Sequence, residues 1–197
     1  MERVIEVLNE ILAMRDPFTA GHEQRVADLA TAIGAELGLD QARLHGLGVA
    51  AIIHDLGKAA VSGEILFKPR ALTAQERDLV RSHPEVGHHL LSRLDLPWPA
   101  AEVALQHHER LDGSGYPAGL RGDAILLEAR IVAVADVVEA MVAHRPWRPP
   151  LGLDRARDEI SGGRGLRYDP DAVDACLALI GHPSFILGAP HPTGATR

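Results

Sequence analysis

The sequence contains only one cysteine, Cys176, among 197 residues, so no disulfide can form within the chain. Cys176 belongs to an apolar pattern with helical spacing that includes Val173, Leu177 and Ile180. Such a pattern predicts a buried core thiol rather than a reactive one. The scarcity of cysteine also fits a cytoplasmic setting, which we expect for this chain.

Long uncharged apolar runs are missing as well. The longest hydrophobic stretch, around residues 125–142, contains four charged side chains: Glu128, Arg130, Asp136 and Glu139. A membrane-spanning helix needs about 20 predominantly apolar residues, which this stretch does not provide. Because the beginning of the sequence also lacks a signal-peptide pattern, we expect no membrane association.

Positive charge is in deficit, since 20 lysines and arginines stand against 27 acidic residues. The formal net charge of -7 leaves no global positive field. A nucleic-acid polymer is therefore not an expected ligand, although a small phosphate compound could still meet local arginines.

The alternation of apolar and polar residues that half-buried strands require is hard to find, whereas helical spacing recurs along the sequence. We therefore predict an all-α fold. The length suits one hydrophobic core, and no internal repeat or long linker divides the chain. We expect a compact single-domain helical bundle over residues 1–180, followed by a loosely packed tail over residues 181–197.

Apolar spacing and capping signals predict the individual helices. The first contains residues 4–11 and ends before Asp16-Pro17, and the long helix around Asp136 ends before Pro146. The others cover about residues 22–37, 41–55, 98–109, 153–160 and 170–180. Asp40 and Asp169 are candidate N-caps, Thr73 and Glu76 form a capping-box pattern, and Pro84 suits the first turn of a helix starting near His83. Residues 58–69 are expected to form an irregular connection.

Histidines and acids gather at the ends or on the apolar faces of these helices. Asp136 lies in the middle of the most hydrophobic stretch, where an unpaired carboxylate would cost several kcal/mol. Asp55 follows a second apolar segment, on the inward stripe of the helix predicted over residues 41–55. A metal centre explains this gathering of imidazoles and carboxylates. The candidate ligands are His22, His54, Asp55, His83, His107, His108 and Asp136.

Two ions are expected, because adjacent residues on a helix point about 100° apart. The pairs His54-Asp55 and His107-His108 would each serve more than one ion unless the helix ends point straight at the cluster. In our hypothesis Asp55 bridges the ions. One sphere is completed by His22, His54 and Asp136, and the other by His83, His107 and His108.

Imidazole and carboxylate ligands without thiolate suit iron, manganese or zinc better than magnesium or calcium, which prefer oxygen ligands alone. Among these metals we expect iron or manganese. Two such ions about 3.5–4 Å apart would lower the pKa of a bridging water and hold a phosphate oxygen, which is the chemistry of phosphodiester hydrolysis.

A single histidine on an apolar helix face is usually a core residue, so His22 alone would be weak evidence. The conjunction of five histidines and two acids favours a metal centre. The remaining histidines lack comparable partners and are expected in surface or capping roles: His45, His88, His89, His144, His182 and His191. The glycines at 113 and 115, with Pro117, could form a simple turn.

The motifs resemble a known pattern: His22 with Arg25-Val26, the run His54-Asp55-Leu-Gly-Lys58, His83-Pro84, the run from His107-His108-Glu to Gly-Tyr-Pro117, and Asp136. They are similar to the HD-GYP family of metal-dependent phosphodiesterases, a subset of the HD phosphohydrolase superfamily. The match covers about residues 15–180. The segment HHE-x-x-DG-x-GYP is particular to this subset. The resemblance implies hydrolysis of cyclic di-GMP, or a related cyclic dinucleotide, to a linear dinucleotide or GMP.

The resemblance also implies roles for individual residues. The seven candidate ligands match the metal ligands of the family, with Asp55 also in the catalytic machinery. Lys58 matches the lysine that contacts the scissile phosphate. Arg145 and Arg148 stand where relatives place basic residues near the substrate phosphates, and guanidinium groups suit phosphate. They could equally form a solvated helix end beside Trp147.

The loop from Gly113 to Pro117 would border the site, with Tyr116 next to the substrate. In the family this loop is also linked to protein partners, including diguanylate cyclases.

Two positions depart from the family pattern. Phe18 occupies the place where members with three metals carry a glutamate, so we predict two ions. Leu111 stands where a tryptophan is frequent, which removes aromatic surface near the loop. The sensory or receiver domain common upstream in the family is not in this sequence, so regulation is expected to come from outside the chain.

Two other functions stay open at this point. The protein could be an HD phosphohydrolase of broader specificity, which a substrate panel would separate. It could also be a catalytically idle module that binds the dinucleotide or docks a partner, although an intact set of seven ligands argues against idleness.

Overall fold

The structure, a computed structural model, describes residue 7, residues 21–143 and 149–182, and residues 185 and 187. Apart from residue 7, the helix predicted around residues 4–11 lies outside this part, as do Phe18, Arg145, Arg148 and most of the predicted tail. The described elements are α2 (His22–Glu36), α3 (Gln41–Ile53), η2 (Leu56–Ala60), α4 (Gly63–Leu66), α5 (Ala74–Arg81), α6 (His83–Leu91), α7 (Ala100–Gln106), η3 (Gly122–Ala124), α8 (Leu127–Val142), α9 (Leu153–Gly162) and α10 (Pro170–Gly181).

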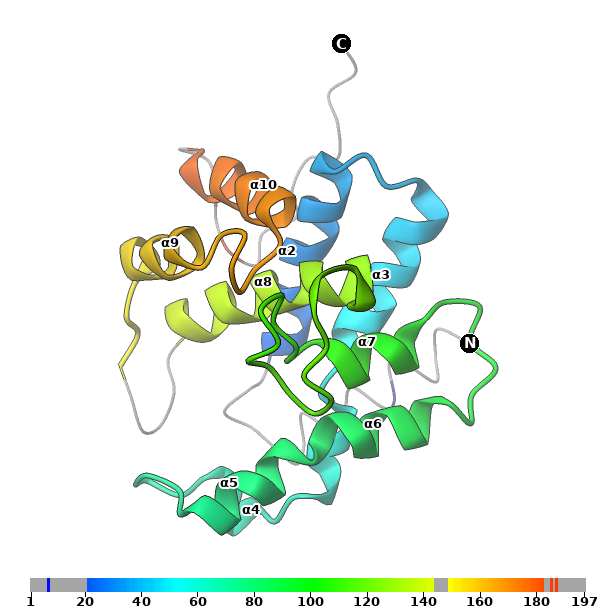
Figure 1. The fold of residues 1–197 in the computed structure, drawn as a ribbon, viewed down its shortest axis with the longest axis vertical. Coiled ribbons are helices and arrows are strands. Elements are labelled where there is room, and N and C mark those ends of the chain that lie inside the picture. The colour runs from blue at the N-terminus through cyan, green and yellow to red at the C-terminus, as the bar shows by residue number, and fades with distance from the viewer. Residues whose placement is uncertain (1–6, 8–20, 144–148, 183–184, 186, 188–197) are drawn as a thin grey trace.

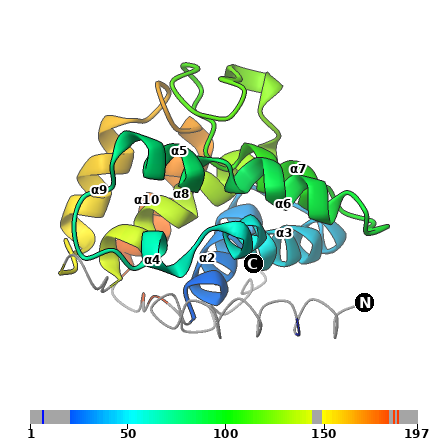
Figure 2. The same ribbon diagram turned by 90° about the horizontal axis from the view of Figure 1, so that it is seen from below.

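The predicted all-α bundle is confirmed. Within the described residues the only β pairing is two isolated bridges, and no strand forms. Helix α8 crosses the middle of the molecule, where it packs against α2, α7, α9 and α10 (Figure 1). Figure 2 shows α2 and α3 on the opposite side of the molecule, in that view, from the segment between α7 and α8. Helices far apart in the sequence therefore meet around α8.

Local signals explain where several helices begin. The Asp40 carboxylate accepts a hydrogen bond from the backbone N–H of Arg43 at 2.9 Å and caps α3. Thr73 and Glu76 form the predicted capping box at α5, and Pro84 lies in the first turn of α6. The Asp169 carboxylate caps α10 through the backbone N–H of Asp171 and of Ala172.

The prediction that α3 carries Asp55 on its inward stripe is wrong. The helix ends at Ile53, and His54 and Asp55 lie in the turn that leads into η2. Gly57 in η2 lies so close to α6 that an added Cβ would be 1.9 Å from the His83 carbonyl oxygen. This close approach sets the path of the chain after Asp55, because a larger residue would push η2 away from α6.

Residues 58–69 are also more regular than predicted. They contain the second part of η2 and the short helix α4, which Ser62 caps by accepting a hydrogen bond from the backbone N–H of Glu64. Helix α7 is shorter than predicted and ends at Gln106. His107 and His108 therefore lie in a turn rather than on the helix.

The core is formed by aliphatic and alanine side chains of α2, α3, α7, α8, α9 and α10. Cys176 lies in this core and is fully buried, as predicted for a structural thiol. Burial raises the pKa of its thiol to about 12, so the group is uncharged near neutral pH. None of the helices in the described part of the chain has the length and apolar character needed to cross a membrane.

Candidate metal centre

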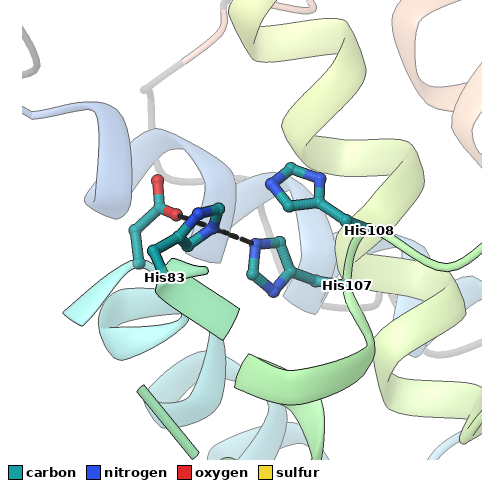
Figure 3. A group of neighbouring side chains, drawn as sticks. His83, His107 and His108 are labelled. Atoms are coloured by element: carbon teal, nitrogen blue, oxygen red, sulfur yellow. Dashed lines mark hydrogen bonds and ion pairs between the residues drawn. The ribbon is translucent and has the colours of Figure 1, made fainter. Parts of the chain in front are cut away.

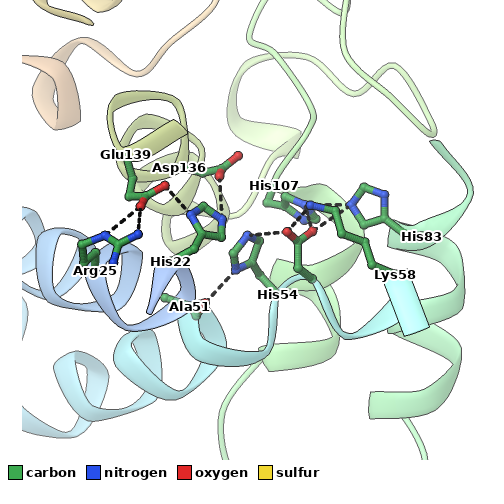
Figure 4. A network of polar contacts seen from close by, with 10 residues as sticks. His22, Arg25, Ala51, His54, Lys58, His83, His107, Asp136 and Glu139 are labelled. Atoms are coloured by element: carbon green, nitrogen blue, oxygen red, sulfur yellow. Dashed lines mark hydrogen bonds and ion pairs between the residues drawn. The ribbon is translucent and has the colours of Figure 1, made fainter. Parts of the chain in front are cut away.

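The structure brings all seven candidate ligands together. Figure 3 labels His108 beside His83 and His107, and Figure 4 labels the other histidine ligands and Asp136. They form two groups, and within each group one ligand atom per residue lies within 4.8 Å of the others. The first, here called the His83 group, contains Asp55, His83, His107 and His108. The second, the His22 group, contains His22, His54 and Asp136. The two groups match the two coordination spheres predicted from the sequence, in which Asp55 belongs to both.

The ligands come from the ends of helices, with one exception. His22 is the first residue of α2, His83 is the first residue of α6, and His54 directly follows α3. Only Asp136 lies in the middle of a helix, on α8. Helix ends can aim neighbouring side chains at one point, which places His107 and His108 in the same group even though they are adjacent.

Within the His83 group, the imidazoles of His83 and His107 face each other through their Nε2 atoms (Figure 3). The Nε2 atoms of His83 and His107 are 3.3 Å apart. Asp55 Oδ1 is 3.1 Å from His83 Nε2 and 3.7 Å from His107 Nε2. The ring of His108 lies over that of His107, with ring centroids 4.1 Å apart. Four potential ligand atoms thus surround one point.

Asp55 is the link between the groups. Its Oδ1 faces His83 and His107, whereas its Oδ2 is 3.5 Å from His54 Nε2 in the other group. On the far side of His54, His22 Nε2 lies 3.4 Å from Asp136 Oδ1. A carboxylate with one oxygen toward each set of ligands has the geometry that a bridging ligand needs.

The tautomers of three histidines follow from their backbone partners. His54, His83 and His107 each place Nδ1 at 2.7–2.8 Å from the carbonyl oxygen three residues earlier in the chain. Because a carbonyl only accepts, Nδ1 must carry the hydrogen and donate it. In the neutral rings Nε2 then keeps its lone pair, and this lone pair points at the shared centre.

Lone pairs that face one another inside the protein are energetically unfavourable, and a bound cation would remove this penalty. His83 and His107 direct two Nε2 lone pairs at each other across 3.3 Å. In addition, His54 Nε2 and Asp55 Oδ1 are buried and lack a hydrogen-bond partner among the described residues. Buried polar atoms without partners are unfavourable, and electron-pair donors that converge on a point suit a metal ion. The donor atoms therefore fit the metal ions that the sequence predicts.

Burial and neighbouring charges set the protonation states of His107, His108 and Asp55. Burial lowers the pKa of His107 to about 4, and burial with the neighbouring His107 also lowers that of His108. Burial alone would raise the pKa of Asp55, but the charge of Lys58 beside it holds the pKa well below its usual range. Near neutral pH His107 and His108 are therefore neutral imidazoles beside an ionised carboxylate, the state in which these residue types bind metals.

His22 differs from the other histidines because a side chain, rather than a backbone carbonyl, accepts from its Nδ1. This partner is Glu139, whose side chain is fully buried one turn after Asp136 on α8. Arg25, one turn after His22 on α2, contacts Glu139 Oε1 through Nε at 2.8 Å and Nη2 at 2.6 Å. Neither Arg25 nor Glu139 is among the site residues predicted from the sequence. The spacing of three residues in both His22-Arg25 and Asp136-Glu139 was the available signal.

The glycine-rich loop is fastened to the ligand segment. The buried Glu109 carboxylate accepts hydrogen bonds from the backbone N–H groups of Ala118, Gly119 and Leu120, at 2.7, 3.1 and 3.0 Å. Gly115 packs on the backbone of residues 108–110, where an added Cβ would lie 2.4 Å from Glu109 Cα. The loop is thus held beside His108, and the second glycine is required by close contact.

Tyr116 brings this loop over the His83 group. Its ring stacks on His108 with centroids 4.7 Å apart, and the Arg81 guanidinium lies 4.9 Å from the Tyr116 centroid. Lys58, at the other side of the centre, contacts Asp55 Oδ2. Arg145 and Arg148 fall outside the described residues. Among the other histidines, His45 packs against Trp98 and His88 contacts Glu102, and neither belongs to the two groups.

Comparison with known proteins places the chain in a family. A family model described as HD domain matches residues 6–172. The chain therefore belongs to the HD domain family, which confirms the family predicted from the sequence motifs.

Curated relatives are similar over most of this chain. A cyclic di-GMP phosphodiesterase of Thermotoga maritima is 41% identical over 178 residues, covering 89% of this chain and 48% of that protein. A 3'3'-cGAMP-specific phosphodiesterase of Vibrio cholerae is 35% identical over 199 residues, covering 100% of this chain and 43% of that protein. The chain thus spans about half the length of these relatives.

Solved structures agree on the fold. The crystal structure of a cyclic GMP-AMP specific phosphodiesterase from Vibrio cholerae superposes with a TM-score of 0.69 at 19% identity. The alignment covers 91% of this chain and 48% of that one. At this level of identity the likeness supports the helical arrangement of the HD domain alone.

Proposed function

We propose that this protein is a metal-dependent phosphodiesterase that hydrolyses a cyclic dinucleotide, either cyclic di-GMP or a relative such as 3'3'-cGAMP, to a linear dinucleotide or GMP. The observation that carries the proposal is Asp55, whose two carboxylate oxygens face the two groups of candidate ligands. The naming of the two relatives as phosphodiesterases of cyclic dinucleotides supports this class of substrate.

Two divalent ions, held by the His22 and His83 groups with Asp55 between them, would supply an activated water and neutralise charge on the phosphate. The ligands are imidazoles and carboxylates without thiolate, which suit iron, manganese or zinc, and we assign iron or manganese to the two positions. Two ions rather than three follow from the absence of a glutamate at position 18.

The chain's own residues would position the phosphate. Lys58 carries an ammonium group at the edge of the centre, beside Asp55 Oδ2, where it could contact the scissile phosphate. A cation at that place would stabilise the negative charge that builds up as water adds to phosphorus and the ester P–O bond breaks. We further assign Tyr116, over His108, and Arg145 and Arg148 to substrate contacts.

The test is turnover by the purified protein. The protein is prepared anaerobically and loaded with iron or manganese, its metal content is measured, and its reactions with cyclic di-GMP and 3'3'-cGAMP are followed by chromatography. We expect two ions per chain and a linear or mononucleotide product. Absence of turnover of either compound by protein with two bound ions would refute the activity.

The variant Asp55→Ala separates the alternatives. A bridging role requires loss of both metal and activity, so unchanged metal content would refute it. Equal or greater turnover of simple nucleotides and phosphomonoesters would instead identify a broader phosphohydrolase. Binding of the dinucleotide without turnover would identify an idle module. A protein partner at the loop from Gly113 to Pro117, and a cytoplasmic setting, stay predictions.

A further inference from the structure

We infer that Glu139, oriented by Arg25, is a positioning residue that makes the His22 group the stronger of the two metal positions. The inference rests on the function proposed above and adds an asymmetry to it. The two ions would differ in affinity because His22 donates its Nδ1 hydrogen to a carboxylate, whereas His83 and His107 in the other group donate theirs to backbone carbonyls.

The Nδ1 atom of His22 has a different kind of hydrogen-bond acceptor from the Nδ1 atoms of three other histidines. His54, His83 and His107 donate to backbone carbonyls, which are neutral. The acceptor for His22 is the Glu139 carboxylate. An imidazole that donates to a carboxylate is a more electron-rich ligand at its other nitrogen, and its ring is held in one tautomer and orientation. His22 Nε2, which faces Asp136, is therefore a more electron-rich ligand atom than the Nε2 atoms of His54, His83 and His107.

The Glu139 carboxylate is held in place by its surroundings. The Glu139 side chain is fully buried, and it lies on the same face of α8 as Asp136. Arg25 Nε and Nη2 both contact Glu139 Oε1, which leaves Oε2 directed at His22 (Figure 4). His22 and Arg25 share a face of α2 in the same way. Two helices thus present a ligand and its partner as interlocking pairs, because three-residue spacing places side chains on one helix face.

A second glutamate–arginine pair on the same helix lies away from the ligands. Helix α8 carries a similar pair in its first turn, where Glu128 Oε1 accepts from Arg43 Nε at 3.1 Å and from Nη2 at 2.7 Å. That pair also joins α8 to an earlier helix, α3, but it contacts none of the seven ligands in the described structure. Glu128 is therefore a matched control for the loss of a buried glutamate paired with arginine.

The test compares Glu139→Gln with Glu128→Gln in the full chain. Binding of Mn²⁺ is titrated by the electron paramagnetic resonance of the free ion, and the Zn²⁺-loaded protein is used to observe histidine tautomers by nitrogen-15 NMR. Glutamine keeps the shape and can still accept from Nδ1, but it removes the charge. We expect Glu139→Gln to weaken the tighter of the two ions about 10- to 100-fold and leave the weaker ion almost unchanged. The His22 resonances should shift, while Glu128→Gln should change neither.

Arg25→Lys is the second variant, since Arg25 lies at the partly exposed rim and its replacement keeps the charge. It should weaken the same ion by a smaller factor, because lysine cannot contact Oε1 through two nitrogens. This variant decides the question if Glu139→Gln does not fold. Unchanged binding of both ions, or an equal loss of both ions by a folded variant, would overturn the inference. A wild-type protein that does not bind two ions would instead overturn the proposed function.

Discussion

At the scale of the residue, the hydrogen bonds to Nδ1 decide what each histidine can do. The local carbonyls of Ala51, Val80 and Ala104 are each three residues before a histidine and leave its Nε2 free for an ion. These partners require only a turn of helix, so they are built into the ends of the elements. The carboxylate partner of His22 instead comes from a residue 117 positions away.

The protonation of His22 predicts the pH dependence of metal binding. Burial lowers the pKa of His22, but hydrogen bonds and charges from Asp136 and Glu139 outweigh it and raise the pKa to about 9 in the metal-free protein. An ion must displace this proton, so its apparent affinity should rise about tenfold per pH unit up to about pH 9 and then level off. Titration of Mn²⁺ binding across this range measures the slope.

The raised pKa of His22 also makes the stability of the metal-free protein depend on pH. Because the folded pKa is raised, the contribution of His22 to the stability of the metal-free protein is complete below pH 6.5 and is lost as the pH rises through about 9. His107, with its pKa lowered to about 4, should release no proton to a metal near neutral pH. Metal affinity that is flat from pH 6.5 to about 9 would contradict the assignment of the proton to His22.

At the scale of the element, the loop after α7 is held by one buried carboxylate. Glu109→Gln removes the charge that accepts three backbone N–H groups and turns one oxygen into a donor that faces them. We expect a loss of about 1.5–3 kcal/mol in stability, because hydrogen bonds to charged groups contribute about that much. Hydrogen exchange at residues 118–120 should accelerate.

A matched change on α7 serves as the control for this loop. Glu102 is exposed and contacts His88, so Glu102→Gln should change stability by less than about 0.5 kcal/mol. Equal exchange rates at residues 118–120 in Glu109→Gln and the wild type would show that the carboxylate does not hold the loop.

The contact between η2 and α6 makes a second prediction at this scale. Gly57→Ala would place a Cβ 1.9 Å from the His83 carbonyl oxygen and 2.6 Å from the Gly87 nitrogen, both backbone atoms. The helix must move and take His83 with it, so we expect a loss of about 1–3 kcal/mol and weaker metal binding. Thermal melting and metal analysis measure both effects. Gly162→Ala meets nothing within 4 Å and should be nearly neutral, and an equal effect of both variants would contradict this explanation.

At the scale of the whole molecule, the metal centre joins segments from most of the fold. Its ligands come from α2, the turn between α3 and η2, α6, the end of α7, and α8. An ion bound only by the folded chain should therefore stabilise all these segments together. At about 1,000 times its dissociation constant, one ion would add about 4 kcal/mol.

Removal of metal tests this coupling. We expect a chelator to lower the melting temperature, and re-addition of Mn²⁺ to restore it, with exchange protection lost in α2, α6 and α8 together. The Asp55→Ala variant is the control, since it should melt at the same temperature with and without added Mn²⁺. A wild-type protein whose melting does not respond to the chelator would contradict a resident metal.

Much of the fold could be predicted because its signals are local. The Asp40 cap, the capping box of Thr73 and Glu76, and Pro84 at the start of α6 were each read from neighbouring residues, and the structure confirms them. The end of α3 was missed, since apolar periodicity continues through Asp55 although the helix stops at Ile53. Beyond this stop the path of the chain is set by the packing of Gly57 against α6, which is a contact between distant segments.

The candidate site divides along the same line. The chemical types of the seven ligands, the family and the helical class were available from the sequence alone, because side-chain chemistry and helical periodicity depend on nearby residues. Only the tertiary structure decided that Glu139 accepts from His22, that Glu109 holds the loop, and that Asp55 turns one oxygen toward each group. Those contacts depend on how helices far apart in the chain pack around α8, and that packing is set by the complementarity of whole surfaces rather than by any single segment.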